Sequence, residues 1–311
     1  MTTFLRKPML RPAAKPWPRM SVLEQRRTIT AYLFLVPAFA FLIVFLFIPL
    51  FQVIYYSFTD YDLLTAPTWV GLENYQKLFQ DDLFWKSLFH SFIYLAVTPI
   101  LIVLSITLAI IVNRPLRGVY LFRALYYIPV VISAVAIGMI FNFVFSEPSG
   151  LINGALRQTH IIDKPIHFLT DPKYILYSIM SVTVWRGIGY YMVMFLAGLQ
   201  AIPEELYEAA AIDGANRWQQ HLHITVPSLR PVITFVAVIS SIAALRAFDE
   251  IFILTNGTGG LLDSGLTSIF YLYRQAFRFL NIGYAAAIAV VFTAITMIFS
   301  LINLHFLEGK N

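Results

Sequence analysis

Long apolar segments alternate with short polar ones along most of the chain. Each apolar segment has more than 20 residues, about the length that one α-helix needs to cross a bilayer. The segments are 31–58, 89–112, 124–146, 174–198, 231–254 and 283–307. The first is too long for the apolar part of a secretion signal, so we expect it to remain as a membrane anchor. The pattern predicts an all-α integral membrane bundle of six transmembrane helices.

Composition supports a membrane protein and excludes several other classes. Of the 311 residues, 59% are hydrophobic and 13% are charged, whereas soluble domains carry about 25% charged residues. This balance argues against a soluble enzyme and against a disordered chain. The chain has no cysteine, which excludes a disulfide scaffold, a thiolate nucleophile and a Cys-ligated metal site. Scattered histidines with few acidic neighbours give no metal-binding pattern.

The positive charges indicate how the chain lies in the membrane. Thirteen Lys and Arg residues fall on the side of the two termini, and seven fall in the opposite loops. The positive-inside rule then predicts a multi-pass protein of the bacterial inner membrane with both termini in the cytoplasm. We interpret the net charge of +5 as part of this orientation and expect no nucleic-acid partner. Residues 1–29 are predicted to form a basic cytoplasmic tail, and residues 30–311 the transmembrane domain.

Prolines inside the apolar segments predict bends. Pro37, Pro49, Pro99 and Pro129 each interrupt a segment. In a membrane bundle, neighbouring helices can satisfy the carbonyls that proline leaves free. We therefore expect packing kinks within continuous spans. The aromatic-rich segment 59–88 is expected to lie at the outer interface or to form a short surface helix there.

The most informative polar segment is AIPEELYEAAAIDGANRWQQHLHITVPSLRP, residues 201–231, on the predicted cytoplasmic side. Pro203 followed by two glutamates is typical of a helix N-terminus. Gly214 predicts the end of this helix, because glycine enters the left-handed conformation without steric cost. A second short helix is predicted to start near Asn216 and to end at Pro227. The segment therefore predicts two short helices joined at a sharp angle and attached to two spans.

This segment resembles the EAA loop of the permease subunits of bacterial ABC importers. Glu208-Ala209-Ala210, Gly214, Ile224 and Pro227 match its E-A-A-x3-G-x9-I-x-L-P pattern, with Val226 in place of leucine. The stretches 70–75, 197–203 and 254–257 are similar to the maltose-type sugar permeases. The chain resembles the larger maltose permease subunit without its extra N-terminal spans. The resemblance implies the type I ABC importer permease fold.

The resemblance also implies partners and a coupling mechanism. In this family a second permease subunit completes the translocation path, two copies of a cytoplasmic ATPase bind beneath, and an extracytoplasmic binding protein delivers the sugar. Glu208 resembles the glutamate that pairs with an ATPase arginine, Ala209 and Ala210 allow close docking, and Asp213-Gly214 form the bend. The chain contains no G-x-x-x-x-G-K-[ST] motif, so we expect the separate ATPase to use ATP. This chain is expected to bind no cofactor and to be no enzyme.

Polar residues inside the fourth apolar segment are the first candidates for substrate contacts. They are Thr183, Arg186, Gly187 and Tyr190. By the resemblance, Gly187 and Tyr190 fall on residues that contact sugar in the larger maltose permease subunit. Thr183 and Arg186 fall on two further contact positions where the residue types differ. An aromatic ring beside hydroxyl-binding groups suits a sugar.

The fifth apolar segment adds Ser240 and Arg246 as candidate substrate-binding residues. Arg246 lies near the position at which the larger maltose permease subunit offers an asparagine. Arg246 and Asp249 are three residues apart, so on one helix they would share a face and could pair. Either a charge pair within the bundle or a substrate contact would explain Arg246, and the same holds for Arg186. With a neutral substrate, the two arginines would need acidic partners, for which Asp249 and Glu250 are available.

Several substrates and two other transport mechanisms remain as alternatives at this point. A di- or oligosaccharide and a compatible solute such as glucosylglycerol would be neutral, whereas glycerol 3-phosphate would use the intramembrane arginines as anion ligands. An ion-coupled secondary carrier is a less favoured alternative, because no inverted repeat is evident. An ion channel would need a selectivity filter or charged rings, and the sequence indicates neither.

Overall fold

The computed structural model of the protein describes residues 21–114, 117–147 and 149–308, which form two compact units. The first unit ends at Gln52 and the second begins at Val53. The first 20 residues of the predicted tail lie outside the described range.

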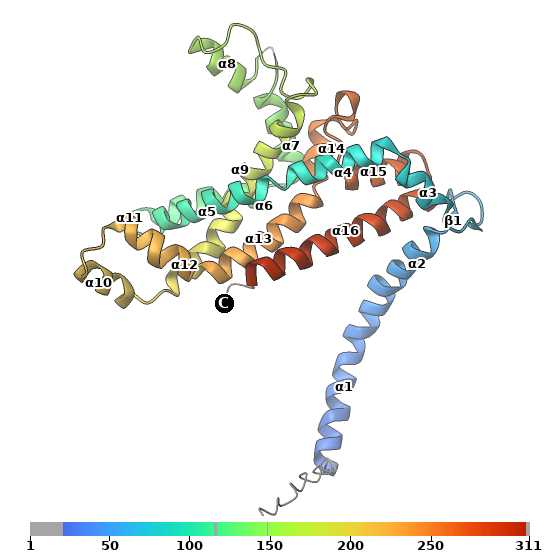
Figure 1. Cartoon of the computed structure of the whole chain (residues 1–311), viewed down its shortest axis with the longest axis horizontal. Helices are drawn as coiled ribbons and strands as arrows, with labels where there is room; N and C mark the ends of the chain where they lie inside the picture. Colours follow the sequence, from blue (N-terminus) through green and yellow to red (C-terminus); the bar gives the residue numbers. More distant parts are fainter. Residues whose placement is uncertain (1–20, 115–116, 148, 309–311) are drawn as a thin grey trace, which may run out of the picture. The chain divides into compact units, whose positions relative to one another are not determined.

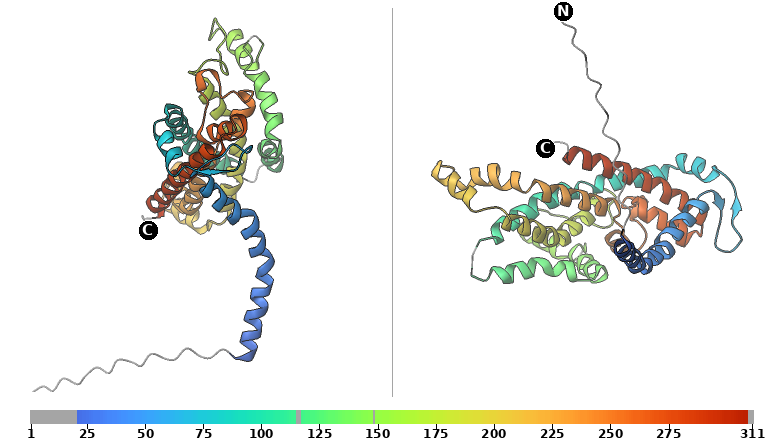
Figure 2. Two further views of the ribbon diagram at one scale, coloured as in Figure 1. Left: turned by 90° about the vertical axis from the view of Figure 1, so that its right-hand side faces the viewer. Right: turned by 90° about the horizontal axis from the view of Figure 1, so that it is seen from below.

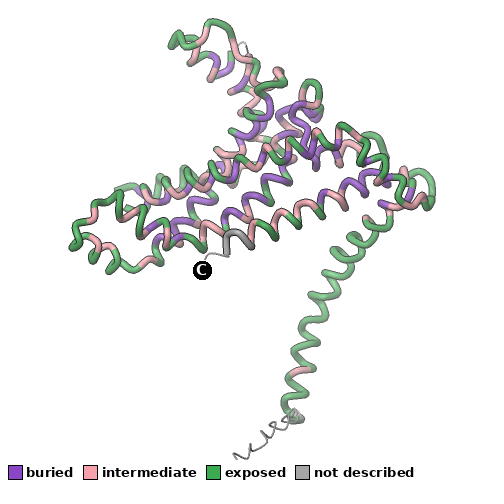
Figure 3. The backbone as a smooth tube through the Cα atoms, in the orientation of Figure 1, coloured by how far each residue is buried: buried purple, intermediate pink, exposed green. Residues whose placement is uncertain are grey.

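The first unit is one long helix. It comprises α1 (Val22–Leu42), a π-helical segment η1 (Ile43–Phe47) and most of α2 (Ile48–Tyr56). A capping box starts it: the Ser21 hydroxyl accepts from the Glu24 N–H, and the Glu24 carboxylate accepts from the Ser21 N–H. Residues 22–29, assigned to the tail by sequence, are therefore helical. Apolar side chains of this helix are exposed along its length (Figure 3), as expected for a helix that meets lipid or another subunit.

The second unit is a bundle of long helices around α9 (Ile175–Gln200). The helices α5 (Val97–Val112) and α6 (Val119–Val131) pack on α9, and α13 (Arg230–Leu245) packs on α5 and on α16 (Ile282–Glu308). Figure 1 shows α13 and α16 running side by side. Buried side chains such as Phe195 and Ile179 are concentrated on these central helices (Figure 3). Among the described residues, five helices are long and apolar enough to span a membrane, or six if one bent pair counts as a span.

The bent pair forms the third predicted span. It consists of α6 and α7 (Ala134–Val144), which meet at an angle of 99°. Pro129 lies near the end of α6, and the Ser133 hydroxyl caps α7 by accepting from the Ala136 N–H. The expectation of a kink within a continuous span was therefore wrong here, because a new N-cap starts a second helix in another direction.

The fifth predicted span is also interrupted. It consists of α13 and α14 (Asp249–Leu254), with Arg246, Ala247 and Phe248 between them. A break inside a membrane leaves backbone carbonyls without helical donors. The buried Thr267 hydroxyl donates to the Ala247 carbonyl at 2.8 Å and satisfies one of them. The break is thus supported by a side chain from another segment.

Glycines allow the two helices of the third span, α6 and α7, to approach their neighbours closely. A Cβ added at Gly189 of α9 would lie 1.9 Å from the Tyr126 carbonyl oxygen of α6, and one at Gly138 of α7 would lie 2.1 Å from a side-chain carbon of Ile253 on α14. Small residues at such contacts are typical of helices packed within membranes. The two halves of the third span are therefore held by α9 and by α14.

Short elements connect the long helices. Three lie toward the start of the second unit: β1 (Thr59–Asp60), paired antiparallel with β2 (Thr68–Trp69), and α3 (Glu73–Phe79). The helix that follows, α4 (Asp82–Tyr94), forms one candidate span together with α5. The short helix expected in segment 59–88 is thus present as α3. The others are α8 (Leu151–Gln158), η3 (Leu261–Asp263), α15 (Ser268–Tyr273) and η4 (Arg274–Arg278).

The remaining elements form the predicted coupling segment, which joins α9 to α13. They are α10 (Glu205–Ile212), α11 (Arg217–Gln220), η2 (His221–Thr225) and α12 (Val226–Ser228). Figures 1 and 2 show α10 and α11 at one end of the bundle, and α3 at the other. The fold thereby separates the coupling segment from the loops at the far end.

Candidate functional site: a central cavity and a coupling segment

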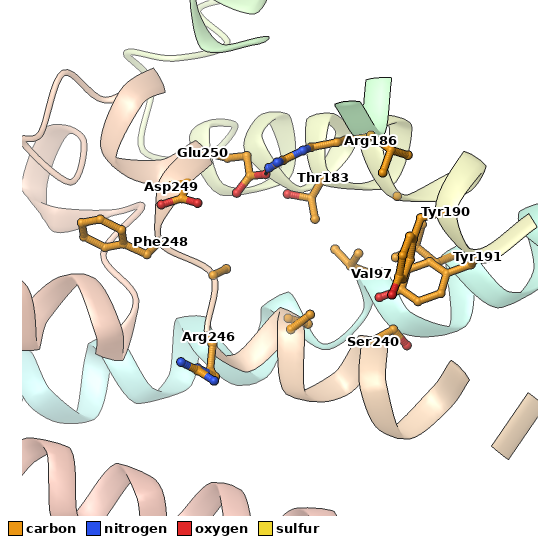
Figure 4. Close-up of a pocket in the computed structure, with 16 residues that line it drawn as sticks. Val97, Thr183, Arg186, Tyr190, Tyr191, Ser240, Arg246, Phe248, Asp249 and Glu250 are labelled. Atoms are coloured by element: carbon orange, nitrogen blue, oxygen red, sulfur yellow. Dashed lines mark hydrogen bonds and ion pairs between the residues drawn. The ribbon is translucent and has the colours of Figure 1, made fainter. Parts of the chain in front are cut away.

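A cavity of about 360 Å³ lies among α5, α6, α9, α13 and α14, and we call it the central cavity. Its wall includes all six residues that the sequence analysis proposed for substrate binding: Thr183, Arg186, Gly187, Tyr190, Ser240 and Arg246. Figure 4 shows the labelled side chains around it. The wall also includes residues that sequence reasoning did not select: Val97, Leu101, Val130, Tyr191, Ala243, Ala244, Ala247, Phe248, Asp249 and Glu250. The fold brings these six residues to one cavity although they lie up to 63 positions apart in the chain.

The spacing of the α9 residues explains why they share one wall. Thr183, Gly187 and Tyr190 follow one another at four and three positions, which places them on one helix face. Tyr190 is 39% exposed, and its ring meets the Tyr191 ring edge-on at 5.1 Å. Gly187 also packs closely on α5, because a Cβ there would lie 3.0 Å from a terminal methyl of Leu101.

Two of the candidate hydroxyls already have intramolecular partners. Thr183 shares a short hydrogen bond with the buried Tyr94 hydroxyl of α4. Ser240 donates to the Val236 carbonyl of its own helix at 2.6 Å and is nearly inaccessible. Each oxygen keeps acceptor capacity. Tyr94 was missed by sequence reasoning, although a tyrosine inside an apolar span was a signal for it.

Among its described residues, the structure contains one of the arginine–acid pairs that the sequence allowed and lacks the other. Arg186 of α9 contacts Glu250 of α14 at 2.7 Å, and the Glu250 side chain is only 13% exposed. The expected face shared by Arg246 and Asp249 was wrong, because α13 ends at Leu245 and α14 begins at Asp249. Among the ion pairs of the described residues, Arg246 and Asp249 have no part. Both residues are exposed, and both line the central cavity at the break between α13 and α14.

The coupling segment has the predicted two-helix form. Helix α10 begins at Glu205, and Gly214 adopts a φ of +84°, where only glycine is unstrained. Asn216 then starts α11 through a capping box with Gln219. The expected end at Pro227 was wrong, because helical structure continues through Ser228. The π-helical turn 221–225 directly precedes the last helical turn, which starts at Val226.

The surface of this segment exposes both charge and apolar groups. Glu208, Ala209 and Asp213 are exposed, and Ala210 is half-buried. A hollow of about 310 Å³ lies between the two helices, with Ala210, Asp213, Gly214, Ala215, Gln219, Gln220, His223 and Ile224 around it. Ile212 and Trp218 flank the bend with 87% and 75% exposure. Large apolar groups exposed outside the spans indicate a contact surface.

A polar contact that sequence reasoning missed fixes the angle between the helices. The buried Thr225 hydroxyl is 2.9 Å from the Tyr207 hydroxyl of α10 and 3.2 Å from His221 Nδ1. Gln220 also donates to the Tyr207 carbonyl at 3.4 Å. Burial, and then the charges of Arg114 and Arg217, lower the pKa of His221. The neutral His221 therefore contacts the Thr225 hydroxyl, and the contact of Tyr207 with the same hydroxyl braces α10 against η2.

Comparison with known proteins identifies the family. Residues 102–308 match the family described as binding-protein-dependent transport system inner membrane component. The chain belongs to this family. It is 36% identical over 281 residues to the probable ABC transporter permease protein YesP of Bacillus subtilis, covering 89% of this chain and 90% of YesP. It is 35% identical over 289 residues to the lactose transport system permease protein LacF of Rhizobium radiobacter, covering 92% and 96%.

Solved structures show the same fold. A bacterial ABC transporter involved in the import of the acidic polysaccharide alginate superposes with a TM-score of 0.78 at 22% identity, covering 92% of this chain and 97% of that one. The permease therefore has the type I importer fold predicted from the sequence. The family consists of membrane components of ABC transporters and not of enzymes, and this sets aside the ion-coupled carrier and the channel. In the described part of the chain, no group of three His, Asp or Glu side chains could hold a metal ion.

Proposed function

We propose that this permease imports a sugar or small glycoside through the central cavity. The observation that supports this most is that Tyr190, whose ring is exposed, lines one cavity together with Thr183, Arg246 and Asp249. An aromatic face suits the C–H face of a sugar, and charged donors and acceptors suit its hydroxyls. Lactose and diacetylchitobiose, after which the similar permeases LacF of Rhizobium radiobacter and NgcF of Streptomyces coelicolor are named, belong to this substrate class.

The cavity wall of this chain is half of the proposed path. A second permease subunit provides the other half, and an extracytoplasmic binding protein delivers the sugar. The alginate importer has been solved with a substrate-bound periplasmic protein, which supports a partner of this kind. The permease lies in the inner membrane with both termini in the cytoplasm, as the charge distribution favours.

The coupling segment docks on a cytoplasmic ATPase, of which two copies bind beneath the two permease subunits. Glu208 pairs with an arginine of the ATPase, Ala209 and Ala210 permit close approach, and the exposed Ile212 and Trp218 add apolar area. Asp213 and Gly214 hold the bend. Because the Tyr207–Thr225 contact braces the two helices, a push on α10 is transmitted to α13. The ATPase binds ATP, and this chain needs no cofactor of its own.

A second candidate substrate is glycerol 3-phosphate. Arg246 supports it, because an exposed guanidinium without an ion-pair partner among the described residues can bind phosphate. Arg186 is less suited to this role, since Glu250 already neutralises it. The favoured substrate is therefore a neutral glycoside.

The test is ATPase stimulation of the reconstituted importer with its binding protein across lactose, trehalose, glucosylglycerol and glycerol 3-phosphate. Stimulation by a glycoside, lost with Tyr190→Ala, is the expected result. Stimulation by glycerol 3-phosphate alone would reject the glycoside. Unchanged stimulation in Tyr190→Ala would reject the central cavity as its binding site.

A further inference from the structure

A second and larger cavity lies at the far end of α14, and we call it the loop cavity. Its volume is about 760 Å³, within the range of small-molecule sites. Three segments form it: the end of α7 with Ser146 and Glu147, the pair Leu169–Thr170, and the loop from Leu254 to Leu262. In the orientation proposed above, these segments face the outside of the cell.

The two cavities lie in series along one short helix. Asp249 and Glu250, the first residues of α14, line the central cavity, and Leu254 and Thr255 at its end line the loop cavity. Six helical residues span about 9 Å. A solute that moves from the outside toward the central cavity along α14 therefore meets the loop cavity first.

The polar groups of the loop cavity match sugar hydroxyls. Asn142 donates its amide to the Gly138 carbonyl, which leaves its oxygen as an acceptor. Asn256 is exposed and contributes both a donor and an acceptor, and the Glu147 carboxylate is a strong acceptor. Leu169 and Leu261 line the same space and can meet apolar C–H groups.

These groups are held in place before any ligand arrives. Glu147 accepts from Thr170 and pairs with His167 at 2.8 Å. In the opposite loop, the Gly259 N–H donates to the Thr255 hydroxyl at 3.0 Å, and Lys86 donates to the Leu262 carbonyl at 2.6 Å. Binding a sugar thus requires little ordering of the wall, and preorganisation favours affinity.

The charge of the loop cavity selects among substrates. Glu147 is the one formally charged residue of its lining. The Thr170 hydroxyl and then His167 hold the pKa of Glu147 below its ordinary value, so the carboxylate stays ionised at neutral pH. The described residues that line the cavity include no Lys or Arg to bind a phosphate, a sulfonate or a uronate.

We propose that the loop cavity is a second sugar subsite, which binds uncharged glycosides before they enter the central cavity. This inference rests on the proposed sugar import. The loop cavity adds a second binding site to the proposed path. It also gives a reason why anionic substrates are disfavoured, which the central cavity alone does not give.

The experiment uses the complete transporter in nanodiscs without the binding protein, and measures saturation-transfer NMR with lactose, trehalose, glucosylglycerol and glycerol 3-phosphate. In a Tyr190→Ala background, a neutral glycoside should still bind. Adding Glu147→Gln and Asn256→Gly should then raise its apparent Kd about tenfold, since the hydrogen bond to the charged carboxylate is lost. Asn256→Gly keeps the backbone intact, because Asn256 has a φ of +50°. Glu73→Gln, an exposed carboxylate on α3, is the control and should change nothing.

Three outcomes would overturn the subsite. Loss of all glycoside binding with Tyr190→Ala alone would leave sugar import standing but remove the second site. Weaker binding of the sugar-free binding protein to Glu147→Gln, with unchanged sugar affinity, would make this surface a docking face. Failure of every glycoside to bind the wild type or to stimulate its ATPase would remove both the subsite and the proposed function.

Discussion

Arg186 on α9 and Glu250 on α14 form an ion pair of 2.7 Å in the wall of the central cavity. The pair connects α14, the second helix of the interrupted fifth span, to α9, the fourth span. Because Glu250 is mostly buried, either residue alone would leave a poorly solvated charge. The pair therefore positions α14, which lies between the two cavities.

Glu250→Gln should weaken this tie. We expect a loss of about 1–3 kcal/mol in stability, less than for a fully buried pair because the Arg186 side chain is 30% exposed. Thermal unfolding of the purified complex measures it. Exchanging the charges, with Arg186→Glu and Glu250→Arg together, should recover part of the loss. A double variant no more stable than Glu250→Gln would contradict a direct pair.

Gly138→Ala tests the contact between α7 and α14. The new Cβ would overlap with Ile253, and overpacking costs about 1–3 kcal/mol. Ile253→Ala in the same chain should relieve most of this cost, as read from the melting temperature. Gly154→Ala on α8, where a Cβ meets nothing within 4 Å, is the matched control and should be neutral or stabilising.

Glu208→Lys tests docking on the ATPase. Reversing the charge should reduce binding-protein-stimulated ATPase activity about tenfold, since a close charge pair at an interface is worth about 1.5 kcal/mol or more. Assembly in the membrane should remain. Glu205→Lys, three residues earlier on the same exposed helix, is the control. Equal effects of both variants would argue for bulk charge and against a specific pair.

Gly214→Val tests the bend of the coupling segment. A β-branched residue at a φ of +84° costs about 1–2 kcal/mol and shifts the angle between α10 and α11. We expect transport and ATPase activity to become uncoupled. Gly118→Val carries the same strain at a φ of +82°, in a turn outside this segment. Its transport per ATP hydrolysed should stay at the wild-type value, and a matching loss there would attribute the effect to general instability.

Low pH should weaken the brace at Thr225. The pKa of His221 in the folded protein is lowered by burial from its ordinary 6.5, so the unfolded state binds more protons as pH falls. Stability is therefore complete above about pH 6.5 and declines as pH falls toward the folded pKa. Melting temperatures from pH 7.5 to 5.5 measure the decline, which should be smaller in His221→Gln. An identical pH profile in that variant would exclude His221 as the cause.

The sequence predicted the apolar spans, the bend at Gly214 and six of the sixteen residues that line the central cavity. Long apolar runs, a glycine at a helix end and polar groups inside spans each have a local physical cause. The break after Leu245 had no such signal, because it depends on a hydrogen bond from Thr267, 20 residues away. The sequence offered both Asp249 and Glu250 as acidic partners for the arginines, and only the packing of α14 against α9 assigns Glu250 to Arg186.

The broken fifth span has an electrical consequence. It brings two positive and two negative side chains to one place within the membrane-spanning bundle: Arg186, Arg246, Asp249 and Glu250. Their formal charges cancel, so a rearrangement that carries all four together moves no net charge through the membrane field. With an uncharged solute in the cavity, the rate of uptake should then be independent of the membrane voltage.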